Sequence, residues 1–449
     1  MHFCFVNMPI EYYSPVSGGA ISTIIMSTAR ELLARDHRVS VLTIVNGDGH
    51  ETYAIGDVIP IRAPKRDDLH FLQRRLSSLR RRLSRWDWPY FEHYLRSVRQ
   101  QLALLSPAPD AVVVFNDLVS PSYLKRTLPA ASILVWLQNE WNTRFDVSKT
   151  DRATRSFLTC SDSIRHWTSR RHHLPLDRFR VVHSGVDRHV FRPRPDYLDP
   201  VETPRVLFLG RIDPNKGPDI AADAVAALRA EGLRLSLTVA GGLWFYGHGR
   251  EMEDPFFRSL KEKMDAAGAQ YLGHVPRPGL PELVRQHDIA CVLSRSQEPF
   301  GLVALEAMAS GCAVISSDRG GLPEACGNAA TLLDPDDFQA VKNALRRLVT
   351  DPALLRRAKQ QSVERAAQAP WSACAQHLEE AASPAGQPAH STQSDVSHPR
   401  TGPVLTSALA AAPPQNSLQR SQVFQNPRSG KSLIENRKSK IENSPQSAP

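Results

Sequence analysis

The order in which short apolar runs and helix-like segments alternate constrains the fold of this chain most strongly. Residues 3–8 form an apolar run and a glycine-containing loop follows. Residues 21–34 then carry apolar side chains at helical spacing, and residues 39–45 form a second apolar run. This strand–loop–helix–strand order predicts a parallel sheet with helices on its faces. Further strands of this sheet are predicted at 111–115, 132–137 and 178–185.

The same pattern begins again after a polar stretch that contains Pro193, Pro195, Pro200 and Pro204. We interpret this stretch as an interdomain linker. Beyond it, strands are predicted at 205–210, 233–241, 271–275, 289–294 and 313–316, and helices at 217–231, 254–267, 280–288 and 302–311. The chain is therefore predicted to be α/β, with two doubly wound, Rossmann-like domains that face a ligand-binding cleft at the carboxyl ends of their sheets.

Length and composition agree with this organisation. A chain of 449 residues is long enough for two or three domains, and 41% hydrophobic residues suffice to bury their cores. We predict a first domain over 1–190, completed by a helix at 371–382, and a second domain over 200–367. From about residue 383 the chain is rich in Ser, Gln, Pro, Asn and basic residues with few aromatics, which predicts a disordered tail over 383–449.

Charge and cysteine usage bear on partners and compartment. The formal charge of +9 favours anionic partners such as phosphates, nucleic acid or a membrane surface, although a soluble Arg-rich protein has the same balance. The six cysteines form no CxxC pair, which predicts reduced, buried thiols in a cytoplasmic protein. The first residues have no basic segment and no run of about 18 apolar residues exists, so we expect neither a signal peptide nor a membrane span.

The segment 298–306 (EPFGLVALE) carries the most informative motif, because it follows a predicted strand and opens a predicted helix. Gly301 lets the backbone approach a ligand closely, and the N–H groups of Leu302 and Val303 at the helix start suit a diphosphate. Glu306, further along the helix, can accept two hydroxyl hydrogen bonds, as a ribose would offer. Glu298, before the helix, can bind sugar hydroxyls.

A second cluster lies at 210–217 (GRIDPNKG), where the first strand of the second domain ends. Arg211 provides a planar fork of donors and Lys216 a compact ammonium, both expected at the carboxyl edge of the sheet. Together they can neutralise a diphosphate and the charge that grows on it as it leaves. No DxD-like pair suggests a Mg²⁺ site, since Asp336–Asp337 lies in a Pro-rich turn, so we expect protein cations to replace a metal.

With these motifs, residues 1 to about 380 resemble the retaining GT-B glycosyltransferases of family 4. The resemblance also includes the segments Gly18–Gly19, RVVHSGVD (180–187), AGG (240–242), GHV (273–275) and GGLPE (320–324). It implies a nucleotide diphosphate sugar donor (UDP- or GDP-linked), no cofactor, and a saccharide or lipid-linked acceptor in cell-envelope glycan synthesis. It also implies transfer with retention, by a debated route in which the leaving phosphate can take the acceptor's proton.

The resemblance assigns a role to each matched residue. Arg211 and Lys216 would bind the diphosphate, Glu298 the transferred sugar and Glu306 the ribose. The backbone around His274 and Val275 would meet the base, and Gly18 and Gly19 would close over the phosphates. The remaining donor-binding positions are Gly210, Phe300, Gly301, Leu302 and Val303.

The sequence departs from the family pattern after the predicted strand at 132–137. Gln138 stands there in place of a common His. Gln138 can hydrogen-bond a sugar hydroxyl but cannot shuttle a proton, and it either lines the site or only caps a strand. Ser184 replaces the usual Asn of the NGVD turn, a milder change. His183 and His274 are expected to be structural, as lone histidines usually are.

Taken singly, each motif has a simpler interpretation. A glycine pair is more often a turn, Arg211 and Lys216 are more often surface charges, and Glu306 could be an exposed helix residue. The joint pattern in its strand–helix context favours a nucleotide-sugar site. An epimerase, a sugar-phosphate synthase or a non-catalytic binding module on the same scaffold stays open. An oxidoreductase is disfavoured because SGGA, not GxGxxG, follows the first strand, and we expect no nucleic-acid partner.

One further segment, 69–86, has a basic amphipathic pattern. Its leucines follow helical spacing and its arginines cover the rest: Leu72, Leu76, Leu79, Leu83, Arg74, Arg75, Arg80, Arg81, Arg82 and Arg85. Such a helix can lie on an anionic membrane surface or pack its leucines on the first domain.

Overall fold

The computed structural model describes residues 1–9, 11–16, 19–44, 52–61, 88–141, 147–243 and 251–383. All of these residues lie within one compact unit, Met1–Ser391. They contain two parallel sheets. In each sheet the strand that comes first in the chain lies in the interior, and later strands are added first on one side of it and then on the other, as in doubly wound folds.

The first sheet has the order β3-β2-β1-β4-β5-β6-β7. Its strands are β1 His2–Val6, β2 Arg38–Ile44, β3 Asp57–Ile61, β4 Ala111–Phe115, β5 Ser132–Leu137, β6 Ser156–Thr159 and β7 Phe179–Val181. The helices that connect them are α1 Ala20–Leu33, α3 Trp88–Leu104, α4 Pro121–Thr127, α5 Ser148–Ala153 and α6 Asp162–His172.

The second sheet has the order β10-β9-β8-β11-β12-β13. Its strands are β8 Arg205–Leu209, β9 Ser236–Ala240, β10 Gln270–Gly273, β11 Ile289–Val292, β12 Ala313–Ser317 and β13 Ala330–Leu333. Its helices are α7 Pro218–Ala230, α8 Pro255–Ala267, α9 Leu280–Arg285, α10 Leu302–Ala309, α11 Leu322–Cys326, α12 Phe338–Thr350 and α13 Pro352–Ala367.

Strand β1 shows why these apolar runs form buried parallel strands. Successive side chains point to opposite faces of a sheet. Phe3 and Phe5 accordingly join one buried cluster, and Cys4 and Val6 join another. Helices cover both faces, so the run from Phe3 to Val6 is apolar on both sides instead of alternating.

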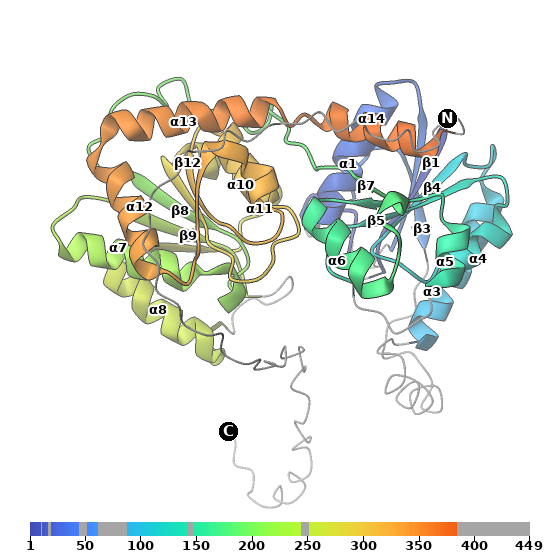
Figure 1. Cartoon of the computed structure of the whole chain (residues 1–449), viewed down its shortest axis with the longest axis horizontal. Helices are drawn as coiled ribbons and strands as arrows, with labels where there is room; N and C mark the ends of the chain where they lie inside the picture. The colour runs from blue at the N-terminus through green and yellow to red at the C-terminus, as the bar shows by residue number, and fades with distance from the viewer. Residues whose placement is uncertain are drawn as a thin grey trace, which may run out of the picture. The chain divides into compact units, whose positions relative to one another are not determined.

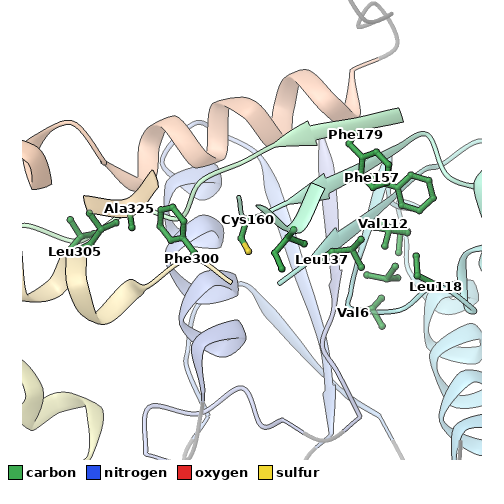
Figure 2. Close-up of a cluster of buried hydrophobic side chains, with 14 of the residues drawn as sticks. Val6, Val112, Leu118, Leu137, Phe157, Cys160, Phe179, Phe300, Leu305 and Ala325 are labelled. Atoms are coloured by element: carbon green, nitrogen blue, oxygen red, sulfur yellow. The ribbon is translucent and has the colours of Figure 1, made fainter. Parts of the chain in front are cut away.

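The cluster that contains Val6 continues into the second half of the chain. Figure 2 shows Phe300 between Ala325 of α11 and Cys160 at the end of β6. The Cys160 thiol also donates a hydrogen bond to the Pro299 carbonyl, with 3.4 Å between sulfur and oxygen. The loop that carries the predicted diphosphate motif is therefore packed into a buried core.

The last described helix, α14 (Trp371–Ala382), returns to the first sheet. It lies beside α1 (Figure 1). Glu379 accepts hydrogen bonds from Arg35 at 2.8 Å and from the His37 ring at 2.7 Å. The Ser132 hydroxyl at the start of β5 donates to the Ala382 carbonyl at 3.1 Å. Helix α14 thus has the bounds predicted for the helix that completes the first domain.

Most predicted elements are confirmed with small shifts at their ends. The strands at 111–115 and 132–137 have the predicted bounds. The strand predicted over 178–185 is wrong in length, because only Phe179–Val181 pair with β6. All six cysteines are buried thiols, as predicted. Within the described residues, no helix combines the length and apolarity needed to cross a bilayer.

A buried charge cluster fixes the end of the second sheet opposite the predicted site. Asp288, fully buried before β11, accepts hydrogen bonds from Arg205 and Lys359, each at 3.0 Å, and from Arg194 of the linker at 2.9 Å. Burial opposes the charge on Asp288, but these bonds and the Lys359 charge outweigh it and hold its pKa well below the usual range. The cluster ties the linker and α13 to the sheet.

We predict that Asp288→Asn lowers the free energy of unfolding by about 3–5 kcal/mol, because it leaves buried cations uncompensated. Because the pKa of Asp288 is lowered by folding, its stabilisation is complete above the unfolded-state pKa of about 3.9 and is lost as pH falls through the folded-state value. Urea unfolding at pH 7 measures the loss. The control is Asp265→Asn, which breaks an exposed pair with Lys261 and should change stability by at most about 0.5 kcal/mol. Equal effects of the two substitutions would contradict the assignment.

Candidate functional site

A cavity of about 580 Å³ lies where the carboxyl ends of strands from both sheets meet. Its lining includes most of the residues predicted from the motifs: Gln138, Gly210, Arg211, Lys216, Glu298, Phe300, Gly301, Leu302 and Val303. Residues from the first half of the chain complete it: Met8, Glu11, Ala20, Ile21, Ile24, Asn139, Trp141 and Ser184. The structure therefore brings together the two motif clusters that the sequence separates by about 80 residues.

The start of α10 forms one wall of this cavity. Gly301 has φ +111°, in the left-handed region, and its position is the N-cap of the helix. No side chain of this helix caps its first N–H groups. The backbone of Leu302 and Val303 therefore offers donors, with the positive end of the helix dipole behind them, to an anion in the cavity.

The basic side chains lie beside this helix start. The Lys216 ammonium bonds to a carboxylate oxygen of Glu298 at 2.5 Å, and the Ser294 hydroxyl donates to the same oxygen at 2.8 Å. Arg211 is 42% exposed and lies 4.0 Å from Asp213. Lys216 and Glu298 thus place a cation next to a carboxylate. This arrangement is expected at a site that binds both a phosphate and sugar hydroxyls.

Glu306 is not part of this cavity lining. It is buried, and one of its carboxylate oxygens accepts a hydrogen bond from Arg277 at 2.6 Å in a separate cavity of about 190 Å³. Burial disfavours the Arg277 cation, but the charge of Glu306 and its hydrogen bond outweigh burial and raise the pKa of the guanidinium. The Arg277 guanidinium also lies 5.6 Å from the ring centre of Phe191. The residue assigned to a ribose is therefore paired with an arginine that no sequence motif marks.

Glu11, a second residue missed from the sequence, lies on the wall contributed by the first half of the chain. Its carboxylate accepts a hydrogen bond from the Ser22 backbone N–H at 2.8 Å at the start of α1. Burial raises the pKa of this carboxyl above its usual value, while backbone N–H groups of Ser22, Gly19 and Ile21 act in the opposite direction. In the sequence, the available signal for Glu11 is an acidic residue that precedes the Gly18–Gly19 loop.

Gln138 follows β5 and is 7% exposed. Its backbone N–H donates to the Asn116 side chain at 2.6 Å. Its side-chain nitrogen is buried and has no hydrogen-bond partner among the residues that the structure describes. Gln138 lines the cavity, but this nitrogen has no exposed surface in it, so the role of Gln138 stays a prediction.

The remaining predicted residues have other positions. His274 and Val275 follow β10, the first exposed and the second half-buried, and neither lines the cavity. Gly18 lies outside the described residues, whereas Gly19 precedes α1 beside Glu11. These locations do not test the roles predicted for the residues, which stay predictions.

His183 has a structural contact, consistent with its expected role. Its ring nitrogen lies 2.9 Å from a carboxylate oxygen of Glu324, and the ring stacks on Phe300 at 5.3 Å. Glu324 also accepts hydrogen bonds from the backbone of Asp162 and Ser163 at the start of α6. These contacts join the start of α6 to α11.

The cavity suits the binding of a charged diphosphate and the stabilisation of charge that develops on it. Cationic side chains and a helix start converge on one wall, while Glu298 and Gln138 can hold hydroxyl groups. Asp336 contacts Arg295 and Arg319 instead of the cavity. Within the described ranges, no group of three or more His, Cys, Asp or Glu side chains is placed to hold a metal ion.

We predict that Gly320→Ala disturbs the cavity, because a Cβ on this residue would lie 2.1 Å from the Glu298 carbonyl oxygen. The matched control is Gly232→Ala, where φ is also positive but a Cβ would meet no atom within 4 Å. Gly320→Ala should lower the free energy of unfolding by about 1–3 kcal/mol more than the control, as overpacking does. Thermal and urea unfolding measure the difference, and equal losses in both variants would rule out the clash.

A family model matches the part of the chain that contains the second sheet. Residues 192–365 match the family model described as "Glycosyl transferases group 1". The D-inositol 3-phosphate glycosyltransferase of Mycolicibacterium paratuberculosis is 38% identical over 211 residues, which are 45% of this chain and 46% of the relative. The glycogen synthase of Mycobacterium tuberculosis is 32% identical over 210 residues, or 46% and 48% of the two chains. The chain spans about half the length of these curated relatives.

Solved structures resemble the chain over a larger part of its length. Sucrose-phosphate synthase from Thermosynechococcus elongatus aligns with a TM-score of 0.65 at 18% identity, covering 85% of this chain and 98% of the other. Anabaena HepE in complex with UDP and glucose aligns with a TM-score of 0.62 at 17% identity, with coverage of 85% and 98%. The chain therefore has the GT-B fold, and the group 1 match over 192–365, with relatives named as glycosyltransferases, supports a transferase.

Proposed function

We propose that this chain transfers a hexose-type sugar from a nucleotide diphosphate sugar to a saccharide or lipid-linked acceptor. The observation that carries the proposal is the cavity in which Arg211, Lys216 and the start of α10 converge beside Glu298. Such a set of donors fits a pyrophosphate with an attached sugar.

The names of similar proteins support the donor class. Relatives are named D-inositol 3-phosphate glycosyltransferase and glycogen synthase, and the structure of HepE contains UDP and glucose. By analogy, the donor of this chain is UDP- or GDP-linked. A role in cell-envelope glycan synthesis follows from the same resemblance and belongs to the proposal.

The geometry suggests how bond cleavage is assisted. As the bond to the sugar breaks, negative charge grows on the leaving diphosphate. Lys216, Arg211 and the N–H groups of Leu302 and Val303 face the space where this charge develops, and preorganised donors of this kind lower the barrier. Glu298, held by Lys216 and Ser294, is oriented to hold the sugar. In this scheme Lys216 and Arg211 neutralise the charge on the leaving diphosphate in place of a metal ion. Transfer proceeds with retention of configuration.

The proposal is tested first by donor binding and then by turnover. A ligand that binds the folded state raises its melting temperature, so a panel of UDP-, GDP- and ADP-sugars identifies the donor. Slow release of free sugar and nucleoside diphosphate, measured with and without EDTA, separates an enzyme from a binding module. The anomer released, read by NMR, reports retention. Binding of no nucleotide sugar, or binding without any turnover, would contradict the proposed activity.

We predict that Lys216→Ala lowers donor turnover by about 10²–10³-fold, the usual loss when one charge-stabilising donor is removed. Folding should be preserved, because the Lys216 side chain is partly exposed. The control is Lys263→Ala, which breaks a surface pair with Asp223 on the same half of the chain. Normal turnover in Lys216→Ala, or an equal loss in Lys263→Ala, would argue against this role.

Peripheral contact with an anionic membrane is a second proposal, carried by the basic segment 69–86, which lies outside the described residues. Each basic residue near such a surface contributes about 1 kcal/mol to binding. Changing Arg80, Arg81 and Arg82 to Ser should therefore reduce the amount of protein that sediments with anionic vesicles by more than tenfold. The amount that sediments with neutral vesicles should not change. Unchanged binding to anionic vesicles would remove this proposal.

A further inference from the structure

Lys216 lies at the end of a short turn, Pro214–Lys216, which follows β8 and is called the Lys216 turn below. Within it, the Asp213 carboxylate accepts a hydrogen bond from the Asn215 N–H at 2.8 Å. Because the hydrogen bonds of such a tight turn have poor geometry, contacts from outside are needed to fix it against the sheet. The direction of the Lys216 ammonium therefore depends on what holds this turn.

Arg295, three residues after the end of the neighbouring strand β11, holds the Lys216 turn. Its backbone N–H donates to the Asn215 carbonyl at 2.8 Å, and its guanidinium donates to the Pro214 carbonyl at 2.7 Å. The two segments also pack closely, because a Cβ on Gly217 would lie 2.3 Å from the Leu293 carbonyl oxygen. One residue of the β11 loop thus bonds to two successive carbonyls of the turn.

The Arg295 guanidinium is itself held in place by an aspartate. It bonds to both carboxylate oxygens of Asp219, in the first turn of α7, at 2.8 and 2.7 Å. Paired bonds of this kind fix the plane of a guanidinium as well as its distance. Arg295 therefore ties together the loop after β11, the Lys216 turn and the start of α7.

The loop after β11 also carries the carboxylate to which Lys216 bonds. The Lys216 ammonium and the Ser294 hydroxyl contact the same oxygen of Glu298. By fixing the turn against this loop, Arg295 sets the distance between the ammonium and its carboxylate partner. Arg295 is not among the residues that line the cavity, so its effect on a ligand would pass through Lys216.

We propose that Arg295 is a positioning residue, which clamps the Lys216 turn to the loop before α10 and keeps the Lys216 ammonium directed at the leaving diphosphate. This inference rests on the proposed function, because it takes the role of Lys216 from there. A merely structural Arg295 would stabilise α7 and the turn without affecting how Lys216 acts, and the test separates these two roles.

The first test is a double-mutant cycle on the full chain, with release of sugar from UDP-glucose and GDP-mannose as the assay. Arg295→Gln removes the side-chain bonds and keeps the backbone bond to Asn215. It should lower kcat by about 10- to 100-fold, as small misplacements of a reacting group do, with a smaller change in KM. In a Lys216→Ala background the same substitution should lower kcat by less than about twofold, because the group through which Arg295 acts is gone.

Two further variants complete the cycle. Arg295→Lys should restore only part of kcat, because an ammonium lacks the planar fork that bonds to Asp219, and it serves if Arg295→Gln does not fold. The matched control is Arg178→Gln in the first sheet. The Arg178 side chain is equally exposed, at 30%, and bonds to Asp151 and to the Thr154 carbonyl, each at 2.7 Å. Its loss should lower stability and leave kcat within about twofold.

A second measurement does not depend on catalysis. Acetylation of the lysines by an activated ester, mapped by mass spectrometry, reports how firmly each ammonium is held. Arg295→Gln should raise the acetylation rate of Lys216 by about threefold or more, because an ammonium that leaves Glu298 more often meets the reagent more often. Lys125, which donates to the Ala131 carbonyl at 2.8 Å in the first half of the chain, is the internal reference and should not change.

Several results would overturn the inference. An unchanged kcat in Arg295→Gln, or an equal loss of kcat with and without Lys216, would show that Arg295 does not act through Lys216. An unchanged acetylation rate of Lys216 would show that Arg295 does not hold the Lys216 turn. If the natural protein releases sugar from neither donor, the proposed function fails by itself, and the acetylation rate still decides whether Arg295 positions Lys216.

Discussion

The parallel arrangement of the strands is the constraint on which the site depends. In a parallel sheet every strand ends at the same edge, and each following helix begins there with its N–H groups unpaired and its dipole positive. At this edge of the second sheet, Arg211 and Lys216 follow β8, and helix α10 begins after β11. Part of the positive charge at this edge thus arises from the helix dipole that the topology places there.

The two sheets use the same geometry in opposite ways. At the second sheet, no side chain of the described residues bonds to the first N–H groups of α10, and Lys216 and Arg211 line the same cavity, whereas at the first sheet the Glu11 carboxyl accepts a hydrogen bond from the Ser22 N–H near the start of α1. Glu306 is likewise engaged, in its case by Arg277. A nucleotide would therefore meet an open pyrophosphate position, while its ribose would have to share Glu306 with an arginine.

Much of the fold followed from the sequence because buried parallel strands are continuous apolar runs, such as 111–115 and 132–137. Strand β3 was missed because Pro60 and two half-buried positions weaken its pattern. The cavity lining was largely anticipated, since motif residues at strand ends must meet at one edge. Glu11 and Arg277 could not be predicted as site residues. Glu11 bonds to the start of a helix and Arg277 to a buried carboxylate, and only folding brings these partners near.

The central claim is that the α10 side of the cavity grips a pyrophosphate. A crystal structure of the protein with UDP tests this most directly. We expect phosphate oxygens within hydrogen-bond distance of the Leu302 or Val303 backbone and of the Lys216 or Arg211 side chain. A nucleotide bound elsewhere on the molecule, or a cavity that stays empty at saturating UDP, would contradict it.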